Sequence, residues 1–249
     1  MLENYKNIYY LHFDTLDSTC LWTRNNAHTL EQTQLTCVTA VEQTSGRGRW
    51  SRKWISPRGQ NIYATLYFCL NLDCPYLPNL GQILSLSCST VLKEKGFHPQ
   101  IKWPNDLLLE GKKVAGILCE TVNFSDRIGI ILSIGININM SQDLLDTIDQ
   151  PATSLAQLSG HPWTLEQILE PLVQQFLKDL KIVEKQGFKI FVPAYEALLA
   201  YKGQQIACHD GKNSLHGICE SIDAEGRLNL RLDDGHVVKL TAGEIRFQD

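Results

Sequence analysis

The sequence lacks the features that would place the protein in a membrane or outside the cell. It has no run of about 18 consecutive apolar residues, which a membrane helix needs. Its start, MLENYKNIYYLHF, has no basic segment followed by an apolar one, so we expect no signal peptide. Its eight cysteines form no CxxC pair, which argues against a structural zinc site. We therefore expect a cytoplasmic protein with buried free thiols and no membrane contact.

An excess of positive charge is missing as well. The formal net charge is -4, whereas domains that bind nucleic acid with their whole surface are usually basic. The 249 residues, of which 43% are hydrophobic, suffice for one sizeable domain with a small appendage. We therefore expect a globular protein without a nucleic-acid partner.

Hydrophobic periodicity predicts mixed strands and helices over the first 200 residues. After Lys202-Gly203 the pattern changes to short strands separated by glycine turns, which indicates a small barrel. We place a domain boundary there, giving domains 1–200 and 201–249. The expected strands are 8–13, 36–41, a half-buried 61–70, 101–103 with 106–109, 114–122, 128–138, 205–208, 215–222, 227–232 and 237–240, and the expected helices follow Asp17-Ser18 or cover 80–95, 168–183 and 193–200.

The segment 46–54 concentrates charge in a chain that is otherwise slightly acidic. The stretch GRGRWSRKW contains four cationic residues, two glycines and two tryptophans. Glycine lets the backbone approach a ligand, and the planar guanidinium suits carboxylate or phosphate. Composition alone leaves three interpretations open. The segment is a solvated basic loop, a nucleic-acid contact with Trp50 and Trp54 as stacking surfaces, or a site for a small anion.

Two further segments carry functional residue types. In Lys102-Trp103-Pro104-Asn105-Asp106, proline favours an extended residue before it and a sheet edge, so Lys102 would leave a rigid strand end. Gly116 and Gly135 interrupt strand patterns, where glycine often marks close approach by a ligand or another backbone. Either segment could equally be ordinary packing around a core tryptophan or a buried strand.

Taken together and in order, these segments resemble the biotin–protein ligase family. The resemblance rests on Asp17-Ser18-Thr19, Gln43 with Gly46-Arg47-Gly48-Arg49, Trp54, Lys102 to Asp106, Ala115-Gly116-Ile117-Leu118, Gly135-Ile136-Asn137 and Thr153-Ser154-Leu155. It implies an α+β fold, with a mixed β-sheet catalytic domain that has helices on one face, as in class II synthetases, and a C-terminal SH3-like β-barrel.

The resemblance also implies a reaction, that of a biotin–[acetyl-CoA-carboxylase] ligase. Biotin and MgATP would give biotinyl-5′-AMP, and biotin would then pass to a lysine of a biotin carboxyl carrier protein. That carrier belongs to acetyl-CoA carboxylase or a related carboxylase. The implied ligands are biotin, ATP and Mg²⁺, and the implied assembly is a monomer or a homodimer.

The resemblance assigns roles residue by residue. Lys102 would hold the carboxylate and the α-phosphate together, since the two anions repel each other. Arg47 and Arg49 would close over the ligands and help catalysis, and a closed loop would exclude water from the anhydride. The remaining implied contacts with biotin are Ser18, Thr19, Cys20 and Gln43 near its head, Gly46, Gly48 and Trp54 around it, and Gly116 and Leu118 as the floor of its pocket. Asn105, Asp106 and Asn137 would lie near the nucleotide. The phosphates would mainly hold Mg²⁺, with Asp106 as a further candidate ligand.

This sequence departs from the family pattern at two positions. Cys20 stands where relatives usually carry asparagine, and Ser51 where glycine is common. Sixteen residues precede Asp17, too few for the winged helix of repressor relatives, so we expect no operator binding. Two rival interpretations remain: a lipoate or octanoate ligase of the same superfamily, and a nucleic-acid-binding module that uses residues 47–54.

Overall fold

The structure is a computed structural model that describes residues 8–209 and 214–246, with the Ser51 side chain excluded. The expected effect of Ser51 therefore lies outside the described residues. The chain divides into two compact units. The first comprises residues 8–75 and 112–173 of the described chain, and the second comprises 76–111 and 174–246.

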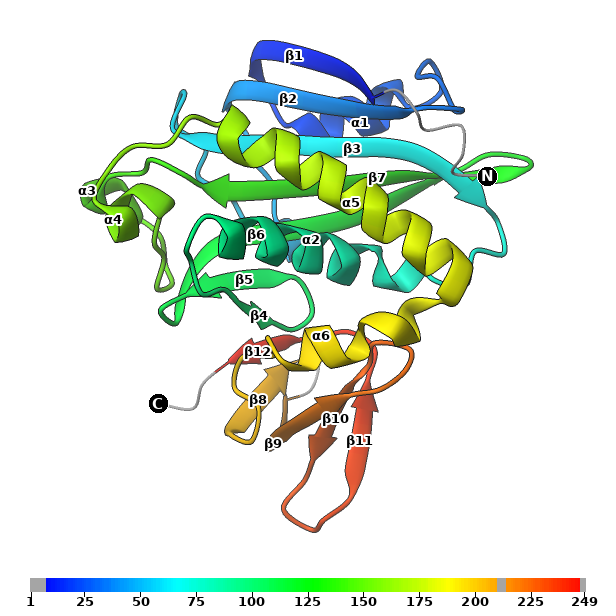
Figure 1. Ribbon diagram of the computed structural model, residues 1–249, viewed down its shortest axis with the longest axis vertical. Helices are drawn as coiled ribbons and strands as arrows, with labels where there is room; N and C mark the ends of the chain where they lie inside the picture. Colours follow the sequence, from blue (N-terminus) through cyan, green and yellow to red (C-terminus); the bar gives the residue numbers. More distant parts are fainter. Residues whose placement is uncertain (1–7, 210–213, 247–249) are drawn as a thin grey trace. The chain divides into compact units, whose positions relative to one another are not determined.

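A mixed β-sheet organises the first unit, in the order β1-β2-β3-β7-β6 (Figure 1). β1 pairs parallel with β2, and the other neighbours pair antiparallel. The mixed sheet that the sequence predicts is therefore confirmed. The elements are β1 Ile8–Leu16, α1 Thr19–Asn26, β2 Leu35–Gln43, η2 Arg49–Ser51, β3 Asn61–Asn71, β6 Lys112–Asn123, β7 Arg127–Asn137, α3 Gln142–Leu145 and α4 Leu155–Ser159.

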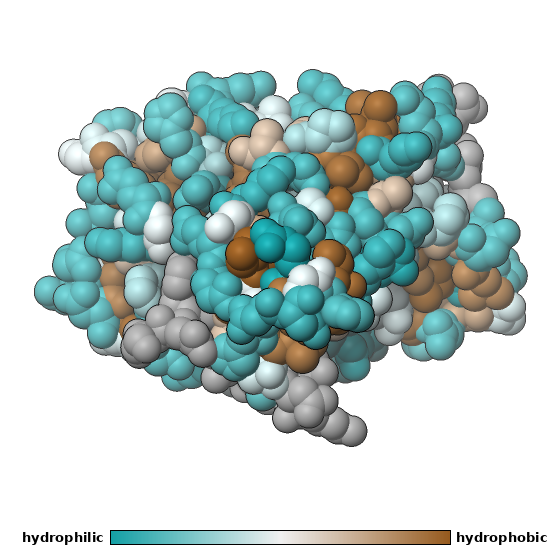
Figure 2. Space-filling model, turned by 90° about the horizontal axis from the view of Figure 1, so that it is seen from below, coloured by the Kyte–Doolittle hydropathy of each residue, from teal (hydrophilic) through white to brown (hydrophobic). Residues whose placement is uncertain are grey.

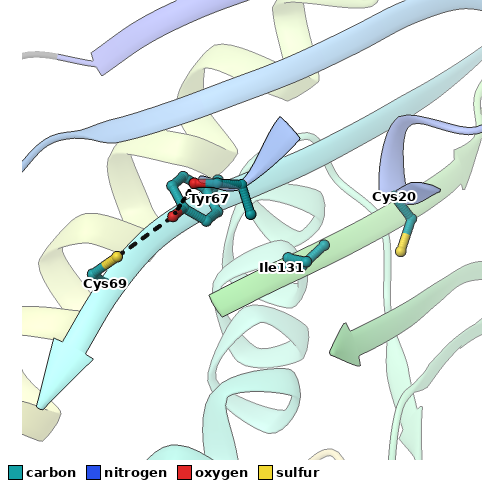
Figure 3. Packing of buried hydrophobic residues seen from close by; sticks show 5 residues of the cluster. Cys20, Tyr67, Cys69 and Ile131 are labelled. Carbon is teal, nitrogen blue, oxygen red and sulfur yellow. Dashed lines mark hydrogen bonds between the residues drawn. The ribbon is translucent and has the colours of Figure 1, made fainter. Parts of the chain in front are cut away.

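Helix α1 packs against one face of this sheet. Cys20 of α1 and Ala27, the C-cap residue of this helix, are buried with Tyr67 and Cys69 of β3 and Ile131 of β7. Figure 3 shows Cys20, Tyr67, Cys69 and Ile131. The Tyr67 hydroxyl donates a 2.9 Å hydrogen bond to the Ala27 carbonyl, so the last turn of α1 is fixed to the strand. This contact places the end of α1 beside β3.

Strand β3 differs from its prediction. Alternation of residue types predicts one buried and one exposed face, but every residue from 61 to 70 is buried. Tyr63, Thr65 and Tyr67 were expected on the exposed side, and each is at most 2% exposed. Their hydroxyls find hydrogen-bond partners inside the protein, which makes burial of these polar groups tolerable.

The second unit contains several helices, a short hairpin and a five-stranded antiparallel sheet. The sheet has the order β11-β10-β9-β8-β12, which supports the small C-terminal β-domain that the sequence predicts. Its last strand was not predicted, and α6 ends at Glu196, before the predicted end at 200. The elements are η3 Leu77–Asn79, α2 Leu80–Glu94, β4 Gln100–Lys102, β5 Asp106–Leu109, η4 Phe188–Phe191, α6 Val192–Glu196, β8 Gln205–His209, β9 Ser214–Ile222, β10 Leu228–Arg231, β11 Val237–Leu240 and β12 Glu244–Arg246, while α5 Glu166–Gln186 begins in the first unit and ends in the second.

No helix among the described residues is both long enough and apolar enough to span a bilayer. The face drawn in Figure 2 is mainly hydrophilic, with hydrophobic residues in small groups. Within residues 8–209 and 214–246 all eight cysteines are free thiols, and six are buried as the sequence predicts, whereas Cys74 is half-buried and Cys119 is exposed. The boundary at 200 between two domains stays a prediction.

Candidate functional site

The site begins where α1 starts. Ser18 is extended (φ −160°, ψ 134°), and its side chain caps the helix by accepting a hydrogen bond from the backbone N–H of Leu21. Its own N–H donates to a carboxylate oxygen of Asp17 at 2.6 Å. Ser18, Thr19 and Cys20 are all buried at this helix start. The helix-cap residues that the sequence predicts are therefore in place, and they present short polar side chains to the sheet.

A directed chain of hydrogen bonds runs from the sheet to the end of β2. Thr19 donates its hydroxyl proton to Gln43 Oε1 at 3.2 Å and accepts from the Thr65 hydroxyl at 2.9 Å. Thr65 has only one hydroxyl proton, so in its 2.9 Å bond with Ser133 the donor must be Ser133. The chain Ser133 to Thr65 to Thr19 to Gln43 thus has a fixed direction.

The orientation of the Gln43 amide follows from this chain. Gln43 Oε1 also accepts from the backbone N–H of Thr19 at 2.9 Å, while Nε2 donates to Ser56 Oγ at 2.9 Å. A flipped amide would place donor against donor at Thr19. The bonds to Thr19 and Ser56 therefore also fix the direction of the second N–H of Gln43 Nε2. We name Thr19, Gln43, Ser56, Thr65 and Ser133 the root of the site.

Cys20 lies next to the root and contacts a charged pair. Its thiol donates to Glu120 Oε2 at 3.2 Å, and Arg24 makes an ion pair with the same oxygen at 2.7 Å. Burial raises the pKa of the Cys20 thiol to about 12, and the nearby Glu120 carboxylate acts in the same direction. Cys20 is therefore a neutral hydrogen-bond donor at physiological pH, as the asparagine of relatives could also be.

Residues 46–54 form a small hairpin. The Trp54 N–H donates to the Gly46 carbonyl at 2.9 Å, and the Gly48 N–H donates to the Arg52 carbonyl at 2.8 Å. The turn at its end has Trp50 at φ 57°, with the Arg49 guanidinium 5.8 Å from the Trp50 ring centroid. The hairpin therefore presents its cations at an exposed end. Arg47, Trp50, Arg52 and Lys53 are exposed, and Arg49 and Gly48 are half-buried.

Gly46 and Trp54 fix the base of this hairpin to the sheet. A Cβ on Gly46 would lie 2.4 Å from both Ser56 Oγ and the Trp54 carbonyl oxygen, so only glycine fits. The Trp54 indole covers two paired glycines of β6 and β7: a Cβ on Gly135 would lie 2.5 Å from its Cε2, and one on Gly116 would lie 3.1 Å from its Cζ3. Both strand glycines are therefore closely approached, but by a side chain and not by the ligand or second backbone that the sequence led us to expect.

Lys113 joins this group, and sequence reasoning missed it. Its ammonium lies 5.5 Å from the Trp54 ring centroid, and a Cβ on Gly116 would lie 3.2 Å from its Cε. The prediction began this strand at 114, whereas β6 begins at Lys112. The signal available in the sequence was a lysine three residues before a strand glycine. The structure therefore puts a cation beside the covered glycines.

Two other expected residues of the first unit lie at its interior. Leu118 is half-buried against the cluster of α1 and β3. Asn137 is 2% exposed, and its Nδ2 donates to the Thr153 carbonyl at 3.1 Å. Asn61 Oδ1 accepts from the Ile138 N–H at 3.0 Å beside it. The Asn137 side chain thus links β7 to the segment before α4, and its expected nucleotide contact stays a prediction.

The expected residues of the second unit lie on one short hairpin. Lys102 of β4 is paired with Asp106 of β5, and both are half-buried, as is Asn105 between them. Trp103 is buried at 1% exposure, and its indole N–H donates to the Gly226 carbonyl at 3.0 Å. The structure thus groups these residues with one another on the β4–β5 hairpin.

The first unit brings part of its expected residues together on one face of the sheet, while Arg47, Gly48 and Arg49 lie on the hairpin and Asn137 makes a separate buried contact with Thr153. Ser18, Thr19, Cys20 and Gln43 meet at the root, and Gly46, Trp54, Gly116 and Leu118 adjoin them. A cavity of about 470 Å³ lies elsewhere in this unit, between Lys112 and residues 142–152, and no expected site residue lines it. In the described ranges no three histidine, cysteine or carboxylate residues gather as a metal site would require.

Comparisons with known proteins identify the family of the chain. Residues 12–139 match the model of the biotin/lipoate A/B protein ligase family. The chain is 31% identical over 231 residues to the bifunctional ligase/repressor BirA of Bacillus spizizenii, covering 90% of this chain and 71% of that protein. It is 32% identical over 221 residues to the biotin–[acetyl-CoA-carboxylase] ligase of Paracoccus denitrificans, covering 84% and 89%.

Solved structures give the same result. A biotin protein ligase from Aquifex aeolicus, in complex with biotin and ATP, superposes with a TM-score of 0.78 at 27% identity. The match covers 96% of this chain and 97% of that one.

Proposed function

The chain belongs to the biotin/lipoate A/B protein ligase family, and from that premise we propose that it is an ATP-dependent biotin–protein ligase. A carboxylate oxygen of biotin attacks the α-phosphorus of ATP, the α–β anhydride bond breaks and pyrophosphate leaves. The ε-amine of a carrier lysine then attacks the acyl carbon, AMP leaves and the amine loses a proton. The acceptor would be a biotin carboxyl carrier protein of acetyl-CoA carboxylase or a related carboxylase.

The observation that carries the choice of biotin is the polar root. A fixed chain from Ser133 through Thr65 and Thr19 to Gln43 adjoins Ser18, so donors and acceptors with set directions lie at one end of the site. The ureido head of biotin has two N–H groups and a carbonyl to pair with them. The dithiolane of lipoate has neither, and a site with oriented hydrogen-bonding groups discriminates strongly against a ligand that lacks matching ones.

The aromatic cover supports a flat ligand beside the root. Trp54 lies over two glycines, and in the described part of the chain its buried indole N–H has no acceptor. An unsatisfied buried donor costs roughly 1–3 kcal/mol, so an acceptor supplied by a ligand would relieve that cost. We propose that Trp54 packs on the bound biotinyl group, with Gly116 and Leu118 as its floor.

Cations carry the chemical step in this proposal. We assign Lys102 to the carboxylate and α-phosphate, with Lys113 as a second cation, because a developing negative charge needs fixed positive groups. Arg47 and Arg49 close over the biotinyl-adenylate. Asn105, Asp106 and Asn137 contact the nucleotide. Magnesium would be held mainly by the phosphates, with Asp106 as its protein ligand.

A biotin-transfer assay tests the proposal. The protein is incubated with ATP, Mg²⁺ and a recombinant apo carrier domain, with labelled biotin or labelled lipoate in parallel. We expect label on the carrier from biotin only, and none when the acceptor lysine of the carrier is replaced by arginine. Label from lipoate alone would transfer the assignment to the rival ligase, and label from neither would reject both.

A further inference from the structure

The turn between β9 and β10 is held in one shape by its own side chains. The Asp223 N–H donates to the Arg227 carbonyl at 2.9 Å, and the Gly226 N–H donates to the Asp223 carbonyl at 2.9 Å. Arg227 Nε donates to Asp223 Oδ2 at 2.7 Å, which closes the turn from outside. Gly226 adopts φ 78°, a conformation that favours glycine. The two carbonyls before and at Gly226 therefore point in fixed directions.

Three buried donors of the same unit converge on these two carbonyls. Gly226 O accepts from Trp103 Nε1 at 3.0 Å and from Gln82 Nε2 at 2.7 Å. Glu225 O accepts from Asn79 Nδ2 at 2.8 Å. The three donor side chains are between 1% and 4% exposed. Ordinary packing of a β-turn needs no such set of donors, and each would be costly to leave unpaired.

Only glycine fits at this turn. A Cβ on Gly226 would lie 2.3 Å from Gln82 Oε1 and 2.5 Å from Asn79 Nδ2. Those two side chains bond to each other at 2.8 Å, so they have little room to move apart. Any side chain at 226 would therefore push the turn away from the indole of Trp103.

Trp103 is the centre of the segment that carries Lys102 and Asp106. The rest of this segment is also held by residues of the C-terminal part. The Ile101 N–H donates to Leu198 O at 2.7 Å, and Tyr195 donates its hydroxyl to Pro104 O at 3.4 Å. Hydrogen bonds therefore hold the chain on both sides of Lys102. A third hydrogen bond, from the Trp103 indole to the Gly226 carbonyl, lies between these two along the segment.

We propose that Gly226 is a positioning residue for adenylate formation. Its carbonyl holds the Trp103 indole and so sets the direction in which Lys102 and Asp106 leave the β4–β5 hairpin. This inference rests on the proposed function, because only that function assigns Lys102 and Asp106 a role in adenylate formation. A displacement of about 1 Å at a reacting group can cost ~10²-fold in rate, so loss of one tie should be visible in kinetics.

The experiment compares two glycine variants of the same sheet. Gly226→Ala introduces the contact with Gln82, whereas Gly235→Ala is its matched control. Gly235 also has a positive φ, 85°, but nothing lies within 4 Å of an added Cβ. Both variants bear a similar backbone strain, and only one disturbs Trp103. Biotin-dependent exchange of pyrophosphate into ATP reports adenylate formation, and calorimetry with biotin alone reports biotin binding.

We expect Gly226→Ala to lower kcat of exchange about tenfold more than Gly235→Ala does. Biotin affinity should stay within about twofold of the parent protein, because the root lies in the first unit. Equal exchange rates in the two variants overturn the inference. Exchange absent from the parent protein rejects the proposed function instead, so the two failures are distinguishable.

A second variant covers the case in which Gly226→Ala does not fold. Trp103→Phe keeps an aromatic ring but removes the N–H that Gly226 accepts. We expect a roughly threefold to tenfold lower kcat of exchange, again with biotin affinity unchanged. Parent-like exchange in folded Trp103→Phe overturns the inference, as does a change in biotin affinity that equals the change in rate.

Discussion

The root of the site and the end of the 46–54 hairpin belong to the same unit, yet they are built differently. The root is made of short side chains on α1, β2, β3 and β7, bonded to one another in one direction. The hairpin end is a turn on which Arg47, Trp50 and Arg52 are exposed to solvent. A ligand meets the root already arranged, whereas the cations of the hairpin are accessible to an anion from solvent.

This difference separates affinity from chemistry. A preorganised root binds without a large ordering cost, so it should determine which molecule is accepted. Cations that gather around the phosphates stabilise charge that develops during the reaction, so they should determine the rate. Substitutions test this separation. It is wrong if replacing a root residue changes only the rate, or if replacing a cation changes only the affinity for biotin.

The largest effect is expected from the two lysines. Lys102→Met and Lys113→Met each remove an ammonium while keeping much of the side-chain length. We expect each to lower biotin-dependent pyrophosphate exchange by ~10²-fold or more, since one fixed cation is lost from the charge that develops. Biotin affinity without ATP should change far less. A variant that exchanges at a near-parent rate removes that lysine from the proposed machinery.

The next effect tests the root itself. Thr65→Val removes the hydroxyl that donates to Thr19 and accepts from Ser133, at nearly constant volume. We expect biotin affinity to fall roughly tenfold, because Ser133 and Thr19 lose their buried partner. Calorimetric titration with biotin measures it. Thr36→Val on β2 is the control, since the buried Thr36 hydroxyl has no partner among the described residues.

The expected contrast between these two threonines is sharp. Thr36→Val should bind biotin as the parent does and should be no less stable, because no hydrogen bond is lost. Equal losses of affinity in the two variants would mean that the chain of hydroxyls has no role in recognition, and the polar root would no longer support biotin over lipoate.

Local chemistry in the sequence predicts much of this site. Ser18 as a helix cap needs only its neighbours in the chain. Gly116 and Gly135 in apolar strands indicate close approach, and the structure supplies the Trp54 ring at both. The order of the motifs likewise predicted the family to which the chain belongs.

What the sequence could not predict depends on contacts between distant residues. The bonds that join Thr19, Thr65 and Ser133 exist only in the observed register of β3 and β7, which no local pattern encodes. Lys113 was missed because its role depends on a ring 59 positions earlier in the chain. The sequence did not predict that residues 61–70 of β3 are all buried. Alternation of residue types reports only polarity, and hydroxyl groups that have hydrogen-bond partners are buried here despite their polarity.

A smaller effect is expected at the hairpin end. Arg49→Gly removes the guanidinium that lies 5.8 Å from the Trp50 ring and increases backbone freedom in the turn. We expect the biotinyl-adenylate to dissociate about fivefold faster, while biotin affinity stays near the parent value. Stopped-flow release of preformed adenylate measures this. Arg49→Lys retains the charge and should release more slowly than Arg49→Gly, and identical rates in all three proteins would exclude Arg49 from retention.

The smallest expected effect concerns Cys20 and alkaline pH. Burial raises the pKa of its thiol from a usual value of 9.0 to about 12, so the folded state keeps a proton that the unfolded chain releases. Stability therefore is unaffected below about pH 9 and falls as pH rises between about 9 and 12. At pH 9.5 the loss from Cys20 should be about 0.8 kcal/mol. Urea unfolding at pH 7.5 and 9.5 measures it, with Cys20→Ala as the comparison, because the other buried thiols contribute equally to both proteins. Cys20→Ala should lose less free energy of unfolding over that interval than the parent. An equal loss would mean that the thiol ionises where it sits, which would place water or a cation beside the root.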